Sequence, residues 1–223
     1  IQNERIMLNG ISFNLSTDTL NLDIKTSLLG KFNIDNSSLA VAACIELGYN
    51  PYDVAAAMKE VAPAEGRMSS IQLRTGAIGI VDYAHTPDAI EKALLTCREI
   101  LQNSGHNNSK LICVFGCGGD RDRTKRPKMG EIASQIADIV IITDDNPRTE
   151  DPASIRKEIL QGIPEENKSK VLEIAERAEA IRYAVDVSGN GDIVLVAGKG
   201  HEKYQIIGQT RFHFDDFEHL KKM

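Results

Sequence analysis

Four short runs of apolar, mainly β-branched residues, separated by helical segments, constrain the fold of this chain more than any other feature. The runs read AIGIVDYA, KLICVFG, DIVIITD and DIVLVAG, and each predicts a buried parallel strand. Helices are expected over 87–102, 127–137, 152–161 and 175–187. Strands that alternate with helices form βαβ units, and such units build a doubly wound, mostly parallel sheet. The sequence therefore predicts an α/β fold.

The first part of the chain shows a different pattern. Alternation of apolar and polar residues predicts strands within 6–29. The next segment predicts a helix that Asn36 or Ser37 caps and that Gly48 ends. The apolar face of this helix is expected to hold Leu39, Ala42, Ala43 and Leu47.

Proline and glycine residues mark the other boundaries. Pro51 opens a second predicted helix, at the position where its missing N–H does no harm. The segment APAEGR, residues 62–67, has no periodicity, and we expect a domain boundary there. The tail is expected to form a hairpin through Gly208 and Gln209, which would add an antiparallel edge to the sheet.

Charge and composition exclude several classes of function. The formal net charge of −6 argues against a general surface for nucleic acid or for an anionic membrane. The longest apolar runs are too short to cross a bilayer. The 4 cysteines include no CxxC pair and no histidine at zinc spacing, so we expect free thiols in a cytoplasmic protein. The chain starts with Ile1 inside a strand-like pattern, which suggests a fragment.

Polar clusters follow all four predicted strands. They are DYAHTPD after 78–81, GCGGDRD after 111–115, TDDNPR after 139–142 and GKGHE after 193–197. In open α/β sheets, ligands bind in the crevice outside the carboxyl ends of the strands. Four clusters at that one edge therefore predict a binding site for a small molecule.

Two of these clusters suit an amino-acid ligand. The glycine turn in GCGGDRD lets backbone N–H groups approach an anion, and Arg121 can clamp a carboxylate or phosphate. An acceptor, an amide, a rigid turn and a planar cation are combined in Asp145, Asn146, Pro147 and Arg148. An ammonium next to a carboxylate requires this mixture. Each segment taken alone is also consistent with an ordinary turn whose arginine is solvated.

The other two clusters supply further polar groups. On a turn with two glycines, Glu202 could receive an ammonium, and His201 could orient a neighbour or carry a proton beside Lys199. Asp82 would suit a ribose hydroxyl, and His85 follows it just before a helix. These clusters are also consistent with a glycine turn that bears exposed charges and with a half-buried loop histidine.

Several signatures of catalysis are absent from the sequence. The 223 residues contain no Walker lysine, no nucleophile elbow, no metal-ligand cluster and no Cys–His pair at a telling spacing. We therefore interpret the chain as a recognition domain without its own chemical machinery.

Four motifs together resemble the Mur ligases of peptidoglycan synthesis. They are GIVDYAHTPDAIEKAL, VFGCGGDRDRTKRPKMGEIA, TDDNPRTEDP and VLVAGKGHEKYQIIG, and the resemblance spans 28–208. This family has a domain for a UDP substrate, a central ATPase domain and a C-terminal Rossmann-like domain for the incoming amino acid. The resemblance implies that residues 1–65 are the end of the ATPase domain and that 66–223 are the Rossmann-like, amino-acid-binding domain.

Within this family the motifs are most similar to those of members that add meso-diaminopimelate. The resemblance assigns that amino acid to Arg121, Asp145, Asn146, Pro147, Arg148, Gly198 and Glu202. It implies that Arg148 binds the second carboxylate of diaminopimelate, which lysine lacks. On the nucleotide side it implies contacts with ATP from Asn33, Asn36, Arg67, Asp82 and His85. The phosphate loop, the carbamylated lysine and the Mg²⁺ ligands of the family are expected upstream, so this chain should supply no catalytic residue and no metal ligand.

The reaction implied by the resemblance is ATP-dependent amide formation. The amine of diaminopimelate attacks a D-glutamyl acyl phosphate of UDP-N-acetylmuramoyl-L-alanyl-D-glutamate, and domain closure gates this step. The chain alone is expected to be inactive and monomeric, without nucleic-acid or membrane partners. Two alternatives stay open, namely a lysine-adding or other amide ligase of the superfamily and a non-catalytic amino-acid-binding module.

Overall fold

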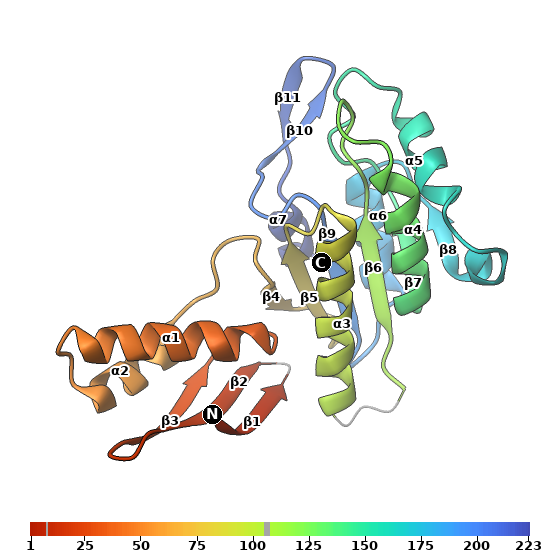
Figure 1. Ribbon diagram of the computed structural model, residues 1–223. Helices are drawn as coiled ribbons and strands as arrows, with labels where there is room; N and C mark the ends of the chain where they lie inside the picture. Colours follow the sequence, from red (N-terminus) through yellow and green to blue (C-terminus); the bar gives the residue numbers. More distant parts are fainter. Residues whose placement is uncertain (8, 105–107) are drawn as a thin grey trace.

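A six-stranded sheet is the main element of the computed structural model, which describes residues 1–7, 9–104 and 108–223 (Figure 1). Its strands lie in the order β4-β5-β9-β6-β7-β8, and all pairs are parallel except that β4 runs antiparallel to β5. The strands span Ser69–Gln72 (β4), Ile78–Asp82 (β5), Leu111–Phe115 (β6), Ile139–Ile142 (β7), Val171–Glu173 (β8) and Ile193–Ala197 (β9). The predicted α/β, mostly parallel sheet is confirmed.

Helices cover both faces of this sheet. Apolar residues of α3, α4 and α5 pack on one face, and those of α6 and α7 pack on the other. The helices span Pro87–Asn103 (α3), Lys125–Ile136 (α4), Pro152–Leu160 (α5), Arg177–Asp186 (α6) and Asp216–Lys221 (α7). The four predicted helices are therefore confirmed within two residues at each end, whereas α7 was not predicted.

Burial on both faces explains why the central strands are apolar throughout. Every residue of β6 and of β9 is buried. In β9, Leu195 belongs to the core on one face, and its neighbours Val194 and Val196 belong to the core on the other. Successive side chains of a strand point to opposite faces, so a strand with two covered faces needs no polar position.

The first part of the chain forms a smaller antiparallel sheet with two helices and a 3₁₀ turn. Its strands lie in the order β1-β2-β3, and in β3 the alternating residues Leu22, Ile24 and Thr26 are buried. The elements span Gln2–Met7 (β1), Gly10–Ser16 (β2), Asn21–Thr26 (β3), Phe32–Glu46 (α1), Pro51–Ala57 (α2) and Met58–Glu60 (η1). Residue 8, which falls within the region predicted to form strands, lies outside the described residues.

The predictions for α1 were partly wrong. The helix begins at Phe32 without a side-chain cap, so Asn36 and Ser37 lie inside it and do not cap it. Its buried residues are Ile34, Ser37 and Val41, at helical spacing. The expected apolar face was wrong, since Leu39 is 70% exposed and Leu47 is 77% exposed. The sequence of α1 is rich in alanine, so more than one face looks apolar. Gly48, with φ +91°, ends the helix as predicted.

The C-terminal hairpin forms as predicted but does not extend the main sheet. Its strands, Tyr204–Ile207 (β10) and Thr210–His213 (β11), make a separate two-stranded sheet, and β4 supplies the antiparallel edge instead. The hairpin pairs with the loop after β7, because Arg148 N donates to Ile206 O at 3.1 Å and Gly208 N donates to Arg148 O at 2.7 Å. It therefore projects beyond the carboxyl ends of the parallel strands (Figure 1).

A linker over 61–68 runs from the smaller sheet to β4 (Figure 1). The two parts also touch where β1 meets α3. The division into domains at residues 65 and 66 stays a prediction. The cysteines Cys44, Cys97, Cys113 and Cys117 are free thiols, as predicted. Among the described residues, none of the helices has the length and apolar character needed to cross a membrane.

Candidate functional site

The loops after β5, β6, β7 and β9 meet at one edge of the sheet, because these strands are parallel neighbours. Gly119 N donates to Asn146 O at 2.9 Å, which joins the loops after β6 and β7. Asn146 Nδ2 donates to Glu202 Oε2 at 2.9 Å, which joins the loop after β9. Gly198 N donates to Asp82 O at 3.1 Å. The four polar clusters of the sequence therefore form one continuous surface.

Hydrogen bonds from β10 hold the DNPR turn, residues 145–148, in place. Asp145, Asn146 and Pro147 are buried, and only Arg148 is half-buried. Gln205 Nε2 donates to Asp145 O at 2.7 Å, and Ile206 N donates to Asn146 Oδ1 at 2.9 Å. Arg148 adopts φ +52°, a left-handed conformation that costs a non-glycine residue about 1–2 kcal/mol. The surrounding contacts therefore fix a strained backbone that aims the arginine side chain.

The Arg148 guanidinium packs against the glycine turn after β6. Arg148 Nη1 donates to Gly119 O at 2.8 Å and to Asn146 O at 3.4 Å. A Cβ on Gly118 would lie 2.8 Å from the same nitrogen, and one on Gly119 would lie 1.9 Å from Pro147 O. The close approach of the Pro147 backbone requires glycine at 119, whereas a side chain at 118 would displace the Arg148 guanidinium. Both positions lie at the turn where the sequence predicted glycines near an anion site.

Two other predicted residues border the same place. Arg121 is exposed, and its Nη1 donates to the carbonyl of its neighbour Asp120 at 3.0 Å. Its Cγ would lie 3.9 Å from a Cβ on Gly118, so two arginines flank this glycine. Gly198 has φ +117°, and a Cβ there would lie 2.8 Å from Asp145 Oδ2. A side chain at Gly198 would therefore collide with the DNPR turn.

Lys199 organises this cluster, although its role was missed in the sequence. Its side chain is fully buried, and Nζ lies 3.2 Å from Asp145 Oδ1 and donates to Asn146 Oδ1 at 2.8 Å. Burial lowers the pKa of Lys199, and the Asp145 carboxylate opposes that shift. Asp145 is therefore engaged in neutralising Lys199. The half-buried Glu202 is the more accessible carboxylate for a ligand ammonium.

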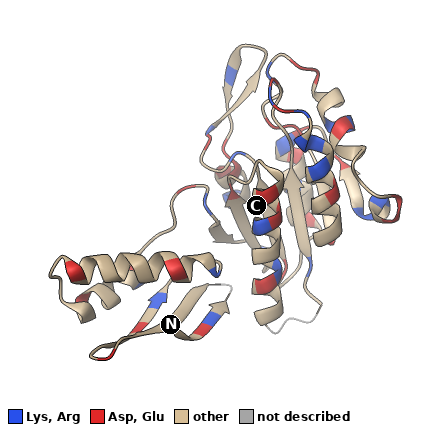
Figure 2. Ribbon diagram, in the orientation of Figure 1, with Lys and Arg blue, Asp and Glu red and all other residues tan. Residues whose placement is uncertain are grey.

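The buried residue Arg126 supports the glycine turn after β6. Arg126 donates to Glu150 through both Nη1 and Nη2, and Nη2 also donates to Gly118 O at 3.2 Å. Glu150 in turn accepts from Asp120 N at 2.5 Å. Hydrogen bonds from Arg126 lower the pKa of Glu150 to about 2. Basic and acidic residues are interleaved over these helices and loops (Figure 2). Within DRDRTKRPK, Arg126 and Asp120 therefore support the site through Glu150.

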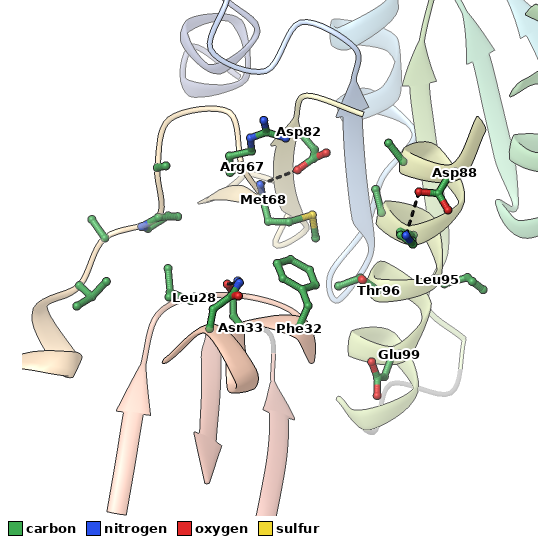
Figure 3. A pocket seen from close by; sticks show the side chains of 18 residues that line it. Leu28, Phe32, Asn33, Arg67, Met68, Asp82, Asp88, Leu95, Thr96 and Glu99 are labelled. Atoms are coloured by element: carbon green, nitrogen blue, oxygen red, sulfur yellow. Dashed lines mark hydrogen bonds and ion pairs between the residues drawn. The ribbon is translucent and has the colours of Figure 1, made fainter. Parts of the chain in front are cut away.

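A cavity of about 1070 Å³ lies between α1, the linker and α3 (Figure 3). It is lined by four of the residues expected to contact ATP, namely Asn33, Asn36, Arg67 and Asp82. Binding sites for small ligands commonly have volumes of about 300–1,000 Å³, so a nucleotide fits in size. Asparagine amides, a guanidinium and a carboxylate match a base, phosphates and a ribose hydroxyl.

Asp82 and His85 differ in their surroundings. Asp82 Oδ2 accepts from Met68 N at 2.9 Å, Oδ1 accepts from Ala84 N at 2.9 Å, and burial raises its pKa. His85 is not among the residues that line the cavity. It is exposed, and its ring centroid lies 4.5 Å from that of Tyr83. Within the part of the chain that the structure describes, no group of three or more His, Cys, Asp or Glu could hold a metal ion.

Comparison with known proteins decides the family. The family described as Mur ligase, glutamate ligase domain, matches residues 66–200. The chain belongs to the Mur ligase family. The resemblance inferred from the sequence motifs is thus confirmed, and the matched segment contains every loop of the surface described above except the end of the GKGHE turn.

Relatives and a solved structure extend this result over the whole chain. The UDP-N-acetylmuramoyl-L-alanyl-D-glutamate--2,6-diaminopimelate ligase of Nostoc sp. is 46% identical over 215 residues, which cover 96% of this chain and 42% of that protein. The enzyme of the same name from Rickettsia prowazekii is 45% identical over 221 residues, covering 99% and 42%. A solved structure of a ligase with this name superposes with a TM-score of 0.75 at 40% identity, covering 100% of this chain and 44% of that one. The chain therefore spans less than half the length of these relatives.

Proposed function

We propose that this chain forms the acceptor part of an ATP-dependent amide ligase that adds meso-diaminopimelate to UDP-N-acetylmuramoyl-L-alanyl-D-glutamate in peptidoglycan synthesis. One observation carries the proposal: a cation and a carboxylate both contact Asn146 at the carboxyl edge of the sheet, Arg148 at its backbone oxygen and Glu202 at its side-chain amide. The names of the relatives that match over 96% and 99% of this chain support the choice of amino acid.

The chemistry of the acceptor site suits diaminopimelate. This amino acid has an ammonium and a carboxylate at each end, and the proposed contacts are Arg121, Asp145, Asn146, Pro147, Arg148, Gly198 and Glu202. Among the described residues, Arg148 uses Nη1 for backbone oxygens, which leaves Nη2 and Nε for a carboxylate. The Glu202 carboxylate would accept a hydrogen bond from the ligand ammonium. Lysine would present a bare methylene to Arg148, and a polar group left without its partner disfavours binding.

The cavity between α1 and α3 is the proposed nucleotide site. Asn33 and Asn36 would contact the base, Asp82 the ribose and Arg67 the phosphates, with His85 beside them outside the cavity. ATP supplies the phosphoryl group that activates the carboxyl to be joined. We also propose that residues 1–65 end a central ATP-binding domain and that 66–223 bind the amino acid. The phosphate loop and Mg²⁺ ligands would lie in the remaining length of the relatives.

The contribution of this chain to the reaction is orientation. Holding the amine of diaminopimelate against the activated carboxyl can lower the barrier by about 7–11 kcal/mol when the geometry is favourable. In this proposal the acceptor residues bind and orient the amino acid, and the chain supplies no catalytic residue, so the 223 residues alone would be inactive. A monomeric cytoplasmic protein without nucleic-acid or membrane partners is part of the same proposal.

A ligation assay tests this proposal. The complete gene product is incubated with ATP, Mg²⁺, UDP-N-acetylmuramoyl-L-alanyl-D-glutamate and labelled meso-diaminopimelate, and the product is separated by chromatography. The expected product contains one added diaminopimelate, with one ADP and one phosphate released for each bond. A protein that binds diaminopimelate but forms no such product under these conditions would be a binding module, and the proposal would be wrong.

A further inference from the structure

The buried ammonium of Lys199 has three partners inside the protein. The residue lies between β9 and β10, and its side chain is 0% exposed. Nζ donates to Asn146 Oδ1 at 2.8 Å and to Tyr204 O at 3.0 Å, and it lies 3.2 Å from Asp145 Oδ1. An ammonium has three N–H donors, and a buried charge persists only when it is paired and hydrogen-bonded. Lys199 is therefore built into the protein and is not itself a ligand contact.

These contacts determine which way the Asn146 amide faces. Its oxygen accepts from Lys199 Nζ and also from Ile206 N at 2.9 Å. Both partners are donors, so the oxygen must face them and Nδ2 must face Glu202, at 2.9 Å from Oε2. With the amide reversed, its NH₂ group would face two donors and its oxygen would face a carboxylate.

We propose that Lys199 is a positioning residue for the acceptor amino acid, because it fixes the Asn146 amide and, through it, the Glu202 carboxylate. This inference rests on the proposed function and deepens it. Among the described residues, the side chains of Arg148 and Glu202 make no hydrogen bond with the Lys199 side chain, and Glu202 meets Lys199 only through the backbone, where Glu202 N donates to Lys199 O at 2.9 Å. Lys199 acts on both through Asn146, whose backbone oxygen also accepts from Arg148 Nη1. The lysine thus sets the spacing between the groups for the ligand carboxylate and ammonium.

Lys199 also fastens the hairpin to the DNPR turn. Its contact with Tyr204 O holds the start of β10, and Ile206 in the same strand accepts from Arg148 N at 3.1 Å. Loss of the ammonium would therefore loosen two supports of the same turn, while the cavity lined by Asp82 and Arg67 lies on other elements.

The test compares Lys199→Met and Lys199→Gln with Lys203→Met in the complete gene product. Lys203 is an exposed lysine of the same loop that pairs with Glu65 at 3.2 Å, so it controls for loss of a positive charge. Gln is one bond shorter than Lys and neutral, so it loses the contact with Asn146 while it stays polar. We expect both Lys199 variants to raise KM for diaminopimelate by about tenfold or more, with KM for ATP within about twofold of the wild type.

A purely structural role predicts a different result. Partial unfolding reduces the amount of active protein and hence the apparent kcat, but it leaves both KM values unchanged. A folded Lys199 variant whose KM for diaminopimelate equals that of Lys203→Met would overturn the inference. If neither Lys199 variant folds, an NMR titration of the wild-type protein is the test. The side-chain amide NMR signal of Asn146 should shift when diaminopimelate is added but not when ATP is added, and an unmoved signal would also overturn the inference.

The failure of this inference differs from failure of the proposed function. If the wild-type protein does not ligate diaminopimelate, the proposed function fails, and that result is read from the wild type alone. If the wild type ligates diaminopimelate and the Lys199 variants bind it equally well, the proposed function stands and only the role of Lys199 is wrong.

Discussion

The Arg148 guanidinium lies on the backbone of Gly119, with Nη1 2.8 Å from the glycine carbonyl oxygen. This contact joins the loop after β7 to the loop after β6, so the two loops act as one surface. The left-handed backbone of Arg148 and the two glycines beneath it have the same effect, since both bring the guanidinium to this position. In our account this position receives a carboxylate.

Replacement of Arg148 should separate recognition of diaminopimelate from recognition of ATP. Arg148→Ala in the complete gene product should raise KM for diaminopimelate by about a hundredfold or more, because paired hydrogen bonds to a charged group are lost. KM for ATP should stay within about twofold of the wild type. Steady-state kinetics measure both values, and Arg182→Ala, an exposed arginine of α6, is the control. An unchanged KM for diaminopimelate would remove Arg148 from the site.

Gly118→Ala should displace Arg148 without altering any ligand-binding group. The new Cβ would lie 2.8 Å from Arg148 Nη1, and the end of a flexible side chain would have to move. We expect KM for diaminopimelate to rise by about tenfold while thermal stability changes little. Gly189→Ala is a matched control, since its nearest neighbour would lie 3.8 Å away. Equal KM values for diaminopimelate in the two variants would show that the contact between Arg148 and the glycine turn does not affect binding.

Gly66 is expected to be essential for packing the linker against the GKGHE turn. A Cβ there would lie 2.1 Å from the carbonyl carbon of Gly200, and φ is +67°. Gly48 also has a positive φ, +91°, but has nothing within 4 Å. Both alanine variants should lose about 1–2 kcal/mol through backbone strain, and Gly66→Ala should lose more. Urea unfolding measures the difference, and equal losses would mean that the contact with Gly200 contributes nothing.

The Arg126–Glu150 contact should make stability depend on acid pH. Hydrogen bonds from Arg126 lower the pKa of Glu150 from its usual 4.5 to about 2 in the folded protein. Its contribution to stability is therefore present above pH 4.5 and is lost as the pH falls toward 2. Glu150→Gln should be less stable at neutral pH and should lose less stability on acidification. Glu166→Gln, an exposed position in the 3₁₀ segment Glu165–Lys170 (η2), should follow the wild type. The measurement is the free energy of unfolding as a function of pH. A difference between Glu150→Gln and the wild type that stays the same at every pH would contradict this prediction.

The sequence was sufficient to predict the sheet and the edge that carries the candidate site, because both depend on local patterns. Four mainly apolar runs predicted burial on two faces, and the turn residues after them had to lie together once the strands were parallel. The helix α1 was predicted less well, since alanine-rich segments present several faces of similar polarity and tertiary packing selected the one with Val41. The place of the hairpin depended on pairing with Arg148, a contact between distant segments that no local pattern reveals.

The candidate site shows the same division. The sequence indicated Arg148 and Glu202 as polar groups at strand ends, and the structure brings their loops together. Lys199 was grouped with exposed charges, because a lysine between glycines in a turn is usually solvated. Its burial follows from Asp145 and Asn146, which lie 54 and 53 residues earlier in the chain and supply the partners for its charge. A lysine two residues after a fully buried strand was the available signal.

The selectivity between meso-diaminopimelate and L-lysine tests the central claim most directly. The measurement is kcat/KM of the complete gene product for each amino acid, at saturating ATP and UDP-N-acetylmuramoyl-L-alanyl-D-glutamate. Because Arg148 would lose its carboxylate partner with lysine, we expect diaminopimelate to be favoured by on the order of 10³-fold or more. Comparable values for the two amino acids, or a preference for lysine, would contradict the account.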